Sequence, residues 1–469
     1  NSVAKLQSRV DAVNTVFAAE LSGGAQPSAD DYKLIGIKGI ESVGAERVNA
    51  LTASIRANGT AVSAVSDLQG LVRILDQTDG AAELAPVADD YALVGVQGVT
   101  ASNVDALNAL VADATAKGID VLDPTGIPDL AKMQSLANIV AHAGERGVYE
   151  PDLNDLRVLE LQNLSTDQLS NILTAINVSA DDGSDINSVA KLQSRVDAVN
   201  TVFATEVSDA DQPIEDDYKL IGIQGIESVG AERVNALTAS VRANDAAVAV
   251  VSDLQGLVNI LDQADGVAEL TPVVASYTQI GVIGIDQRNI GAMNALVSST
   301  SEVGVGVDSF AELNALAKII DLADGRAESA LTINDFALLR IAGVQESNLN
   351  EIVRAITESA NDASDVNTLT KIQNVVNQFL VAVPDDSSPE TSVAAIAAAG
   401  SPVVQLQIDA PGDSVIENIS VPASASAVSS VSDEVSASDE LTTSQPDRMA
   451  SVNQPELSSG VVGEAVRAA

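Results

Sequence analysis

One motif that recurs in this sequence combines residue types that bind ligands in other proteins. The pattern Tyr-x-x-x-Gly-x-x-Gly occurs four times, and its tyrosines are Tyr32, Tyr91, Tyr218 and Tyr277. A tyrosine hydroxyl donates and accepts hydrogen bonds, and glycines permit turns whose backbone approaches a ligand closely. Because the motif recurs, it points to a repeated element and not to one unique site.

The first copy of the motif resembles a known nucleic-acid-binding element. The segment LIGIKGIESVGAERV, residues 34–48, is similar to the helix-hairpin-helix motif, in which a Gly-h-Gly turn presents backbone amides to a phosphate. The glycine spacing departs from that motif, Lys38 is replaced by Gln224 in the second copy, and Glu41 and Glu46 lie alongside. We therefore favour a structural interpretation, in which the glycine ends a helix and the tyrosine packs under the turn.

An asparagine follows the second glycine of each motif by ten residues, at Asn49, Asn108, Asn235 and Asn294. Asparagine is mildly unfavourable inside a helix, so its repeated use indicates a specific hydrogen bond. We expect it to cap the neighbouring turn and not to take part in catalysis.

Two acidic spacers, at residues 181–185 and 361–365, have the composition of calcium loops. They lack the alternating ligands and distal glutamate of an EF-hand, so a solvated linker is the favoured interpretation and weak Ca²⁺ association the alternative. His142 is the only histidine, and without cysteine or a second histidine it supports neither a metal site nor a catalytic triad. We expect no enzyme activity and no cofactor, and predict no catalytic, cofactor-binding or metal-binding residue.

The elements that hold these residues belong to a tandem duplication. Residues 1–80 recur almost unchanged at 187–266, and NSVAKLQSRVDAVNTVF opens both copies. Within each copy the motif position recurs about every 60 residues, with Leu156 and Phe336 in place of tyrosine. Since Asn1 begins where the second copy begins, we expect the chain to be a processed form or fragment of a longer array.

The repeat predicts an all-α chain of about six three-helix modules that form an elongated rod. Each module has an apolar 3-4 stripe on its first helix (Val3, Leu6, Val10, Val13), a short second helix that begins near Asp31 or Asp90, and a third helix. The predicted modules are 1–60, 61–123, 124–184, 185–246, 247–304 and 305–363, followed by a partial seventh at 364–383. Residues 384–469 form a Ser/Ala/Val-rich acidic tail that we expect to be disordered, with two short strands in 403–421 as the alternative.

Composition restricts the partners. The net charge is −42, which disfavours binding to nucleic acid and to anionic lipid surfaces. There is no cysteine or tryptophan, so the cores are expected to be small and aliphatic. No apolar run reaches the length of a membrane span, and we expect no membrane insertion.

In their acidic composition, lack of cysteine, low aromatic content and near-identical tandem copies, residues 1–380 resemble the helical-repeat regions of giant secreted or cell-surface bacterial proteins, such as adhesins. That resemblance implies a non-enzymatic spacer or stalk at the cell surface or outside the cell. The neighbouring modules would be its main partners, together with a surface or extracellular protein. The alternative is a set of repeated ligand-binding modules, similar to the three-helix albumin-binding units of bacterial surface proteins. Helix-hairpin-helix-like nucleic-acid binding ranks below both.

Overall fold

The computed structural model describes residues 2–18, 26–80, 84–144, 149–204, 212–266, 269–302, 307–326, 330–359 and 363–380. Contacts between residues divide the chain into two units, Asn1–Ser387 and Ser388–Ala469. The second unit, and with it the predicted tail and the alternative strands at 403–421, lies outside the described residues.

The prediction of an all-α fold is confirmed for the described residues, which form 21 α-helices and one 3₁₀ helix, η1 (Ser184–Ile186), and no β-strand. Seven opening helices carry the apolar stripe. They are α1 (Ser2–Val16), α5 (Val65–Thr78), α8 (Leu130–His142), α11 (Val189–Val202), α15 (Val251–Ala264), α18 (Phe310–Ala323) and α21 (Leu369–Asn377).

Two further kinds of helix alternate with the opening helices. The short helices are α2 (Ala29–Leu34), α6 (Ala88–Leu93), α9 (Leu153–Arg157), α12 (Glu215–Leu220), α16 (Val274–Thr278) and α19 (Ile333–Leu338). The closing helices are α4 (Ala45–Ala57), α7 (Val104–Ala116), α10 (Leu169–Asn177), α14 (Ala231–Arg242), α17 (Ile290–Glu302) and α20 (Leu349–Thr357). One-turn helices α3 (Ile40–Val43) and α13 (Ile226–Val229) precede α4 and α14.

The short helix α2 shows why these elements have fixed ends. Ser28 and Asp31 form a capping box at its N-terminus, in which each side chain accepts from the other residue's backbone N–H. Gly36 follows the helix with φ of 97°, a left-handed conformation that stops the helix at little steric cost. The helix therefore begins and ends where the sequence predicted, and it holds Tyr32 in the core.

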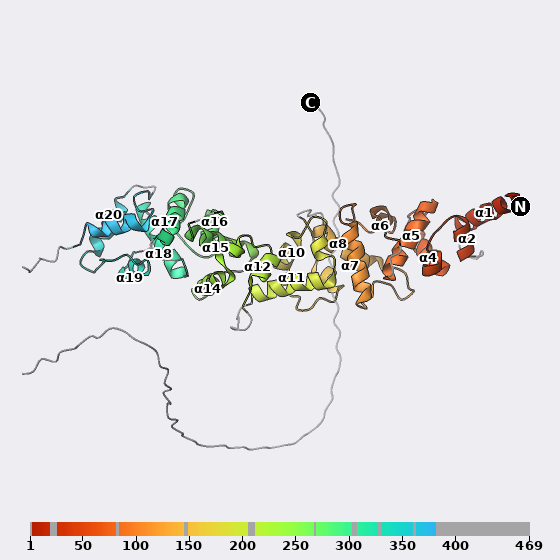
Figure 1. Ribbon diagram of the computed structural model, residues 1–469, viewed down its shortest axis with the longest axis horizontal. Helices are drawn as coiled ribbons and strands as arrows, with labels where there is room; N and C mark the ends of the chain where they lie inside the picture. The colour runs from red at the N-terminus through yellow and green to blue at the C-terminus, as the bar shows by residue number, and fades with distance from the viewer. Residues whose placement is uncertain are drawn as a thin grey trace, which may run out of the picture. The chain divides into compact units, whose positions relative to one another are not determined.

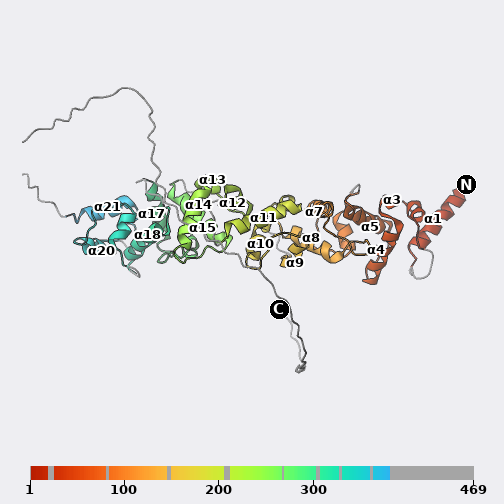
Figure 2. The same ribbon diagram turned by 90° about the horizontal axis from the view of Figure 1, so that it is seen from below.

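The helices of the first unit pack as a continuous series. From α5 onward each opening helix contacts the closing helix before it, as α5 contacts α4 and α11 contacts α10. The six opening helices from α1 to α18 also contact the short helix that follows each of them. In Figures 1 and 2 the labelled helices follow one another in chain order from α1 to α21. One cluster of buried apolar residues extends from Val16 to Val376, so it crosses each predicted module boundary.

Closing helices also form hydrogen bonds beyond the next opening helix in the chain. Each of five closing helices forms a hydrogen bond with the start of the second opening helix that follows it, and we call these the skip bonds. They are Arg47 Nε to Gly126 O (2.6 Å), Val189 N to Asp113 Oδ2 (2.8 Å), Asn171 Nδ2 to Ala249 O (3.0 Å), Phe310 N to Ser240 Oγ (3.0 Å) and Leu369 N to Ser299 Oγ (2.9 Å). A group of helices is thereby tied to the next group and to the one after it.

Candidate functional site

The four motif tyrosines form one repeated hydrogen-bond network. Each tyrosine is buried on a short helix and donates its hydroxyl proton to Oδ1 of the motif asparagine, which lies 17 residues later on the closing helix. The asparagine Nδ2 donates in turn to a proline carbonyl just before the short helix. The four triads are Tyr32–Asn49–Pro27, Tyr91–Asn108–Pro86, Tyr218–Asn235–Pro213 and Tyr277–Asn294–Pro272.

The asparagines therefore make the specific hydrogen bonds that their recurrence predicted, but they do not cap a helix end. They join the closing helix to the segment that leads into the short helix. Where the tyrosine is absent, the asparagine is absent too: Leu156 is followed after 17 residues by Leu173, and Phe336 by Val353. The tyrosine and the asparagine are thus either both present or both replaced, as expected if a buried amide without a hydrogen-bond partner is costly.

The network has no acid–base chemistry near neutral pH. Burial raises the pKa of Tyr32 to about 12, and burial also raises the pKa of Tyr91, Tyr218 and Tyr277 above the usual value for tyrosine. Each hydroxyl is neutral and already donates to an asparagine. The network therefore stabilises the fold and does not supply a nucleophile or a base.

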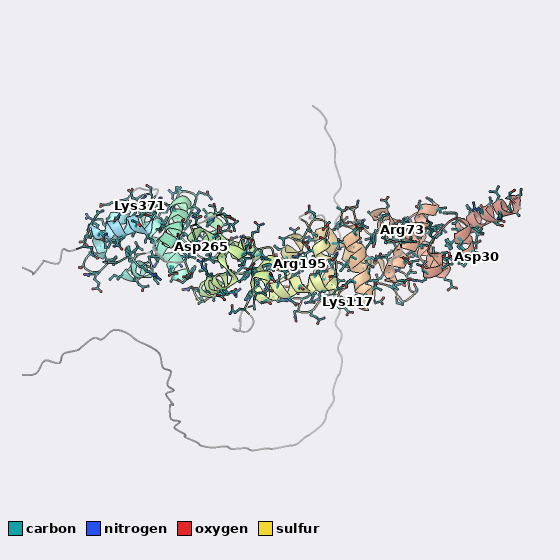
Figure 3. All side chains as sticks on the ribbon, in the orientation of Figure 1. Asp30, Arg73, Lys117, Arg195, Asp265 and Lys371 are labelled. Atoms are coloured by element: carbon teal, nitrogen blue, oxygen red, sulfur yellow. The ribbon has the colours of Figure 1, made fainter. Side chains whose placement is uncertain are left out.

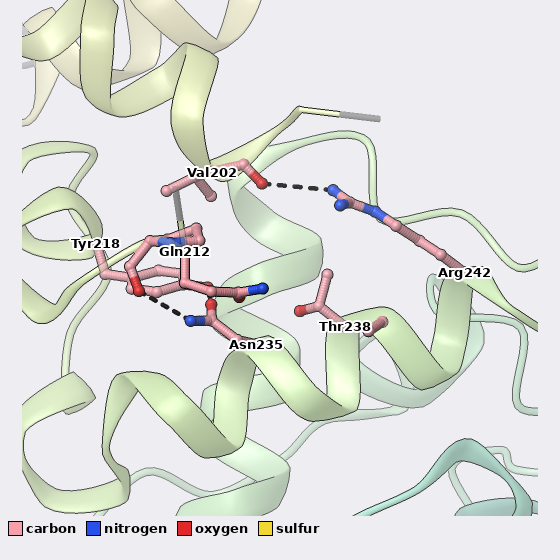
Figure 4. A pocket seen from close by; sticks show the side chains of 8 residues that line it. Val202, Gln212, Tyr218, Asn235, Thr238 and Arg242 are labelled. Carbon is pink, nitrogen blue, oxygen red and sulfur yellow. Dashed lines mark hydrogen bonds between the residues drawn. The ribbon is translucent and has the colours of Figure 1, made fainter. Parts of the chain in front are cut away.

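A cavity of about 230 Å³ opens beside the third of these triads, Tyr218–Asn235–Pro213 (Figure 4). Its lining includes Tyr218, Asn235, Thr238 and Arg242, and the described residues that line it include no carboxylate, histidine or lysine. Arg242 donates to the carbonyls of Val202 and Ala204 at the end of α11, at 3.4 and 3.0 Å. The lining groups are thus largely engaged in joining α14 to α11, and the volume is below the usual range for a ligand pocket.

The glycine turns are held by glutamines of the following opening helix. In each case one side-chain amide accepts from the backbone N–H and donates to the backbone C=O of a single turn residue, and we call this the glutamine clasp. The pairs are Gln69 with Lys38, Gln134 with Gln97, Gln193 with Gln162, Gln255 with Gln224 and Gln373 with Ala342, at 2.8 to 3.3 Å.

The clasped turn persists where glycine is missing. Glu160, Asn163 and Arg340 stand at glycine positions of the motif and keep positive φ of 54°, 59° and 54°. Left-handed backbone costs a non-glycine residue roughly 1–2 kcal/mol. Retention of the conformation at this cost indicates that the position of the turn, fixed by the clasp, matters more to the fold than the glycine itself.

The clasp bears directly on the resemblance to a helix-hairpin-helix. The backbone N–H that lies between the two glycines, at Lys38 and at Gln224, donates to Gln69 and Gln255 at 2.9 and 2.8 Å. A phosphate at this turn would have to displace that side chain. The geometry thus favours the structural interpretation of the motif.

The other candidate residues lie apart from these networks. His142 Nε2 is 3.2 Å from the carbonyl oxygen of Leu173, and His142 is the last residue of α8. In the first acidic spacer, Asp182 and Asp185 accept from the backbone N–H groups of Ser184 and Ala180. Asn361 and Asp362 of the second spacer are outside the described residues. No group of three or more His, Asp or Glu side chains suited to a metal ion was found among the residues that are described.

No family model, no curated protein and no solved structure matches this chain. In the described part of the chain, no helix combines the length and apolar character needed to span a membrane.

The recurrence of glutamine in the sequence signals the clasp, which the predicted site residues did not include. Glutamine recurs at the same position of six opening helices, at Gln7, Gln69, Gln134, Gln193, Gln255 and Gln373. An exposed glutamine on a helix is ordinary, and its partner lies 31 or 37 residues earlier in the chain. Only its recurrence at equivalent positions distinguishes the clasp glutamine from an ordinary surface glutamine.

The duplication supplies a matched test of the clasp. Gln193→Ala removes two bonds to Gln162 and one to Asp197, whereas Gln7→Ala removes, among the described residues, only the equivalent bond to Asp11. We expect Gln193→Ala to lower the free energy of unfolding by about 1–2 kcal/mol and Gln7→Ala by less than about 0.5 kcal/mol. Urea unfolding followed by circular dichroism measures both; equal losses would show that the clasp does not stabilise the fold.

The buried tyrosines predict an alkaline limit to stability. A neutral phenol is favoured in the folded chain, so its contribution is fully present below the unfolded pKa of about 10 and is lost as the pH rises from about 10 towards 12, the folded pKa of Tyr32. We expect ultraviolet absorbance to show tyrosinate forming at higher pH in the native chain than in the denatured chain. Tyr32→Phe should remove part of that difference, and coincident titration curves would contradict the burial.

Proposed function

We propose that this chain is a non-enzymatic structural spacer built from about six stacked three-helix modules. The observation that supports it best is that the recurring polar residues are engaged inside the array. The tyrosine network, the glutamine clasp and the skip bonds use the same residue positions from one group of helices to the next. A repeated unit of this kind extends the length of a protein without adding a new chemical site.

The proposed shape is a rod of modules stacked in chain order. Contacts of each opening helix with the preceding closing helix and the skip bonds to the second following group favour such stacking. A module about 25 Å long gives a stack on the order of 150 Å. Coupling to two successive neighbours would resist bending between modules, which suits a spacer.

We further propose that the spacer operates at the cell surface or outside the cell, in a bacterial adhesin-like protein. The net charge of −42, the absence of cysteine and the near-identical tandem copies support this proposal. Mutual repulsion among negative surfaces would keep such chains apart. Neighbouring modules are the main partners, and no catalytic step is proposed.

Repeated protein binding is the second candidate, because equivalent apolar side chains are exposed in three groups. Val87, Ile214 and Val273 occupy the position just before a short helix and are 50%, 59% and 57% exposed. The other three groups have Ser28, Asp152 and Thr332 there. Capture of a saturable extracellular partner that is lost on changing the three apolar residues to serine would favour binding over spacing.

The rod is tested by a distance between its ends. The chain has no cysteine, so Ser8→Cys and Asn374→Cys, both at exposed positions, accept a donor and an acceptor dye cleanly. A compact globule of about 380 residues has a radius of gyration of about 21 Å and would give efficient energy transfer. The rod predicts almost none, while the control pair Ser8→Cys and Lys38→Cys should transfer efficiently. Efficient transfer between the distant pair would reject the spacer.

A further inference from the structure

Two identical helices in this chain have different surroundings. Residues 1–17 and 187–203 have the same sequence and form α1 and α11. In α1 the apolar stripe is open to solvent: Leu6 is 64% exposed, Val10 45% and Val13 41%. Their equivalents in α11, Leu192, Val196 and Val199, are at most 1% exposed. The same side chains are therefore core residues in one copy and surface residues in the other.

The cover of α11 comes from the helices just before it. Among the described helices, α10, η1 and the more distant α7 contact α11 from the preceding part of the chain. In the described residues no equivalent of α10, η1 or α7 covers α1, and the main contact of α1 is with its own short helix α2. The exposed stripe is thus the face that α11 turns to the preceding group.

Three polar contacts accompany this cover. Arg195 donates to the Ala175 carbonyl at the C-terminal end of α10, at 2.7 Å, and lies where α10 meets α11 (Figure 3). Gln193 clasps the turn residue Gln162. The backbone N–H of Val189 donates to Asp113 of α7 at 2.8 Å. The equivalents Gln7 and Arg9 are exposed on α1.

We propose that the open face of α1 is a docking surface for a helical unit of this chain's own kind, with the arrangement seen in residues 149–186. The unit would place a closing helix like α10 on Leu6, Val10 and Val13. The backbone of its turn would form hydrogen bonds with the side-chain amide of Gln7. The carbonyls in the last turn of its closing helix would accept hydrogen bonds from Arg9.

The polar side chains of α1 determine which kind of unit can dock on its open face. Any apolar helix covers the stripe, but Gln7 requires one turn residue with both its N–H and its C=O directed outward. Arg9 requires the carbonyl end of the covering helix, where the helix dipole also favours a cation. Residues 149–186 present both features to α11 with the same side chains. Two α1 helices from two copies of the chain would cover the stripe but bring no such turn to Gln7.

The test places that unit in front of α1. Residues 1–186 are duplicated ahead of Asn1, so that the original α1 follows the same sequence that precedes α11. The chain has no native cysteine, and Val10→Cys in the original α1 reports cover through its rate of reaction with a thiol reagent. Val196→Cys in the unextended chain gives the rate for the covered position.

We expect Val10→Cys to react rapidly in the unextended chain and at least about tenfold more slowly after the extension, close to Val196→Cys. Changing Ile172 and Ile176 to Asp in the added segment should restore rapid reaction. Circular dichroism checks that helical signal grows with the added helices. An unchanged rate in an extended, fully helical chain overturns the proposal. Protection of Val10→Cys that rises with concentration in the unextended chain overturns it in favour of self-pairing.

Discussion

The structure depends on one constraint, which is that no group of helices in the array can bury its own apolar face. A few short helices expose much of their surface when they stand alone, and the buried side chains of the described residues are mostly aliphatic, so neighbouring helices must supply the missing cover. The sequence of α1 and α11 shows the consequence most clearly, since Leu6 is 64% exposed and Leu192 only 1%. From α5 onward each opening helix packs against the preceding closing helix, and the skip bonds extend that dependence to a second neighbour. A continuous core from Val16 to Val376 follows.

The polar residues that first suggested a binding site serve the same requirement. The tyrosine hydroxyls, the asparagine amides and the glutamine clasps satisfy backbone and side-chain groups where successive helices meet, and an unsatisfied group there would cost about 1–3 kcal/mol. These bonds recur at equivalent positions, so most of the described groups of helices are joined to their neighbours in the same way.

Local structure was predictable from the sequence, and long-range bonding was not. The apolar 3-4 stripe identified the opening helices, and Asp31 and Gly36 marked the ends of α2, because periodicity, capping and left-handed glycine act within a few residues. Burial of Tyr32 was also expected. The partners of Asn49 and Gln193 were not, since they lie 22 and 31 residues away and asparagine and glutamine bond equally well to turns, side chains or water. The skip bond from Asp113 to Val189 spans 76 residues and follows only from the stacking itself. Glu160 shows the converse, because it stands at a glycine position of the motif and yet keeps a positive φ, so the turn is retained without the glycine.

The dependence of each group on its neighbour is tested most directly by hydrogen exchange in the unmodified chain. The amides of α1 and α11 have the same intrinsic exchange rates because residues 1–17 and 187–203 are identical. Peptides that extend past these helices distinguish the copies by mass, since Ala19 stands where the second copy has Thr205. If neighbours supply the stability, α11 should exchange at least about 100-fold more slowly than α1. Equal protection of the two helices would mean that each group is stable by itself, and would contradict the continuous stack.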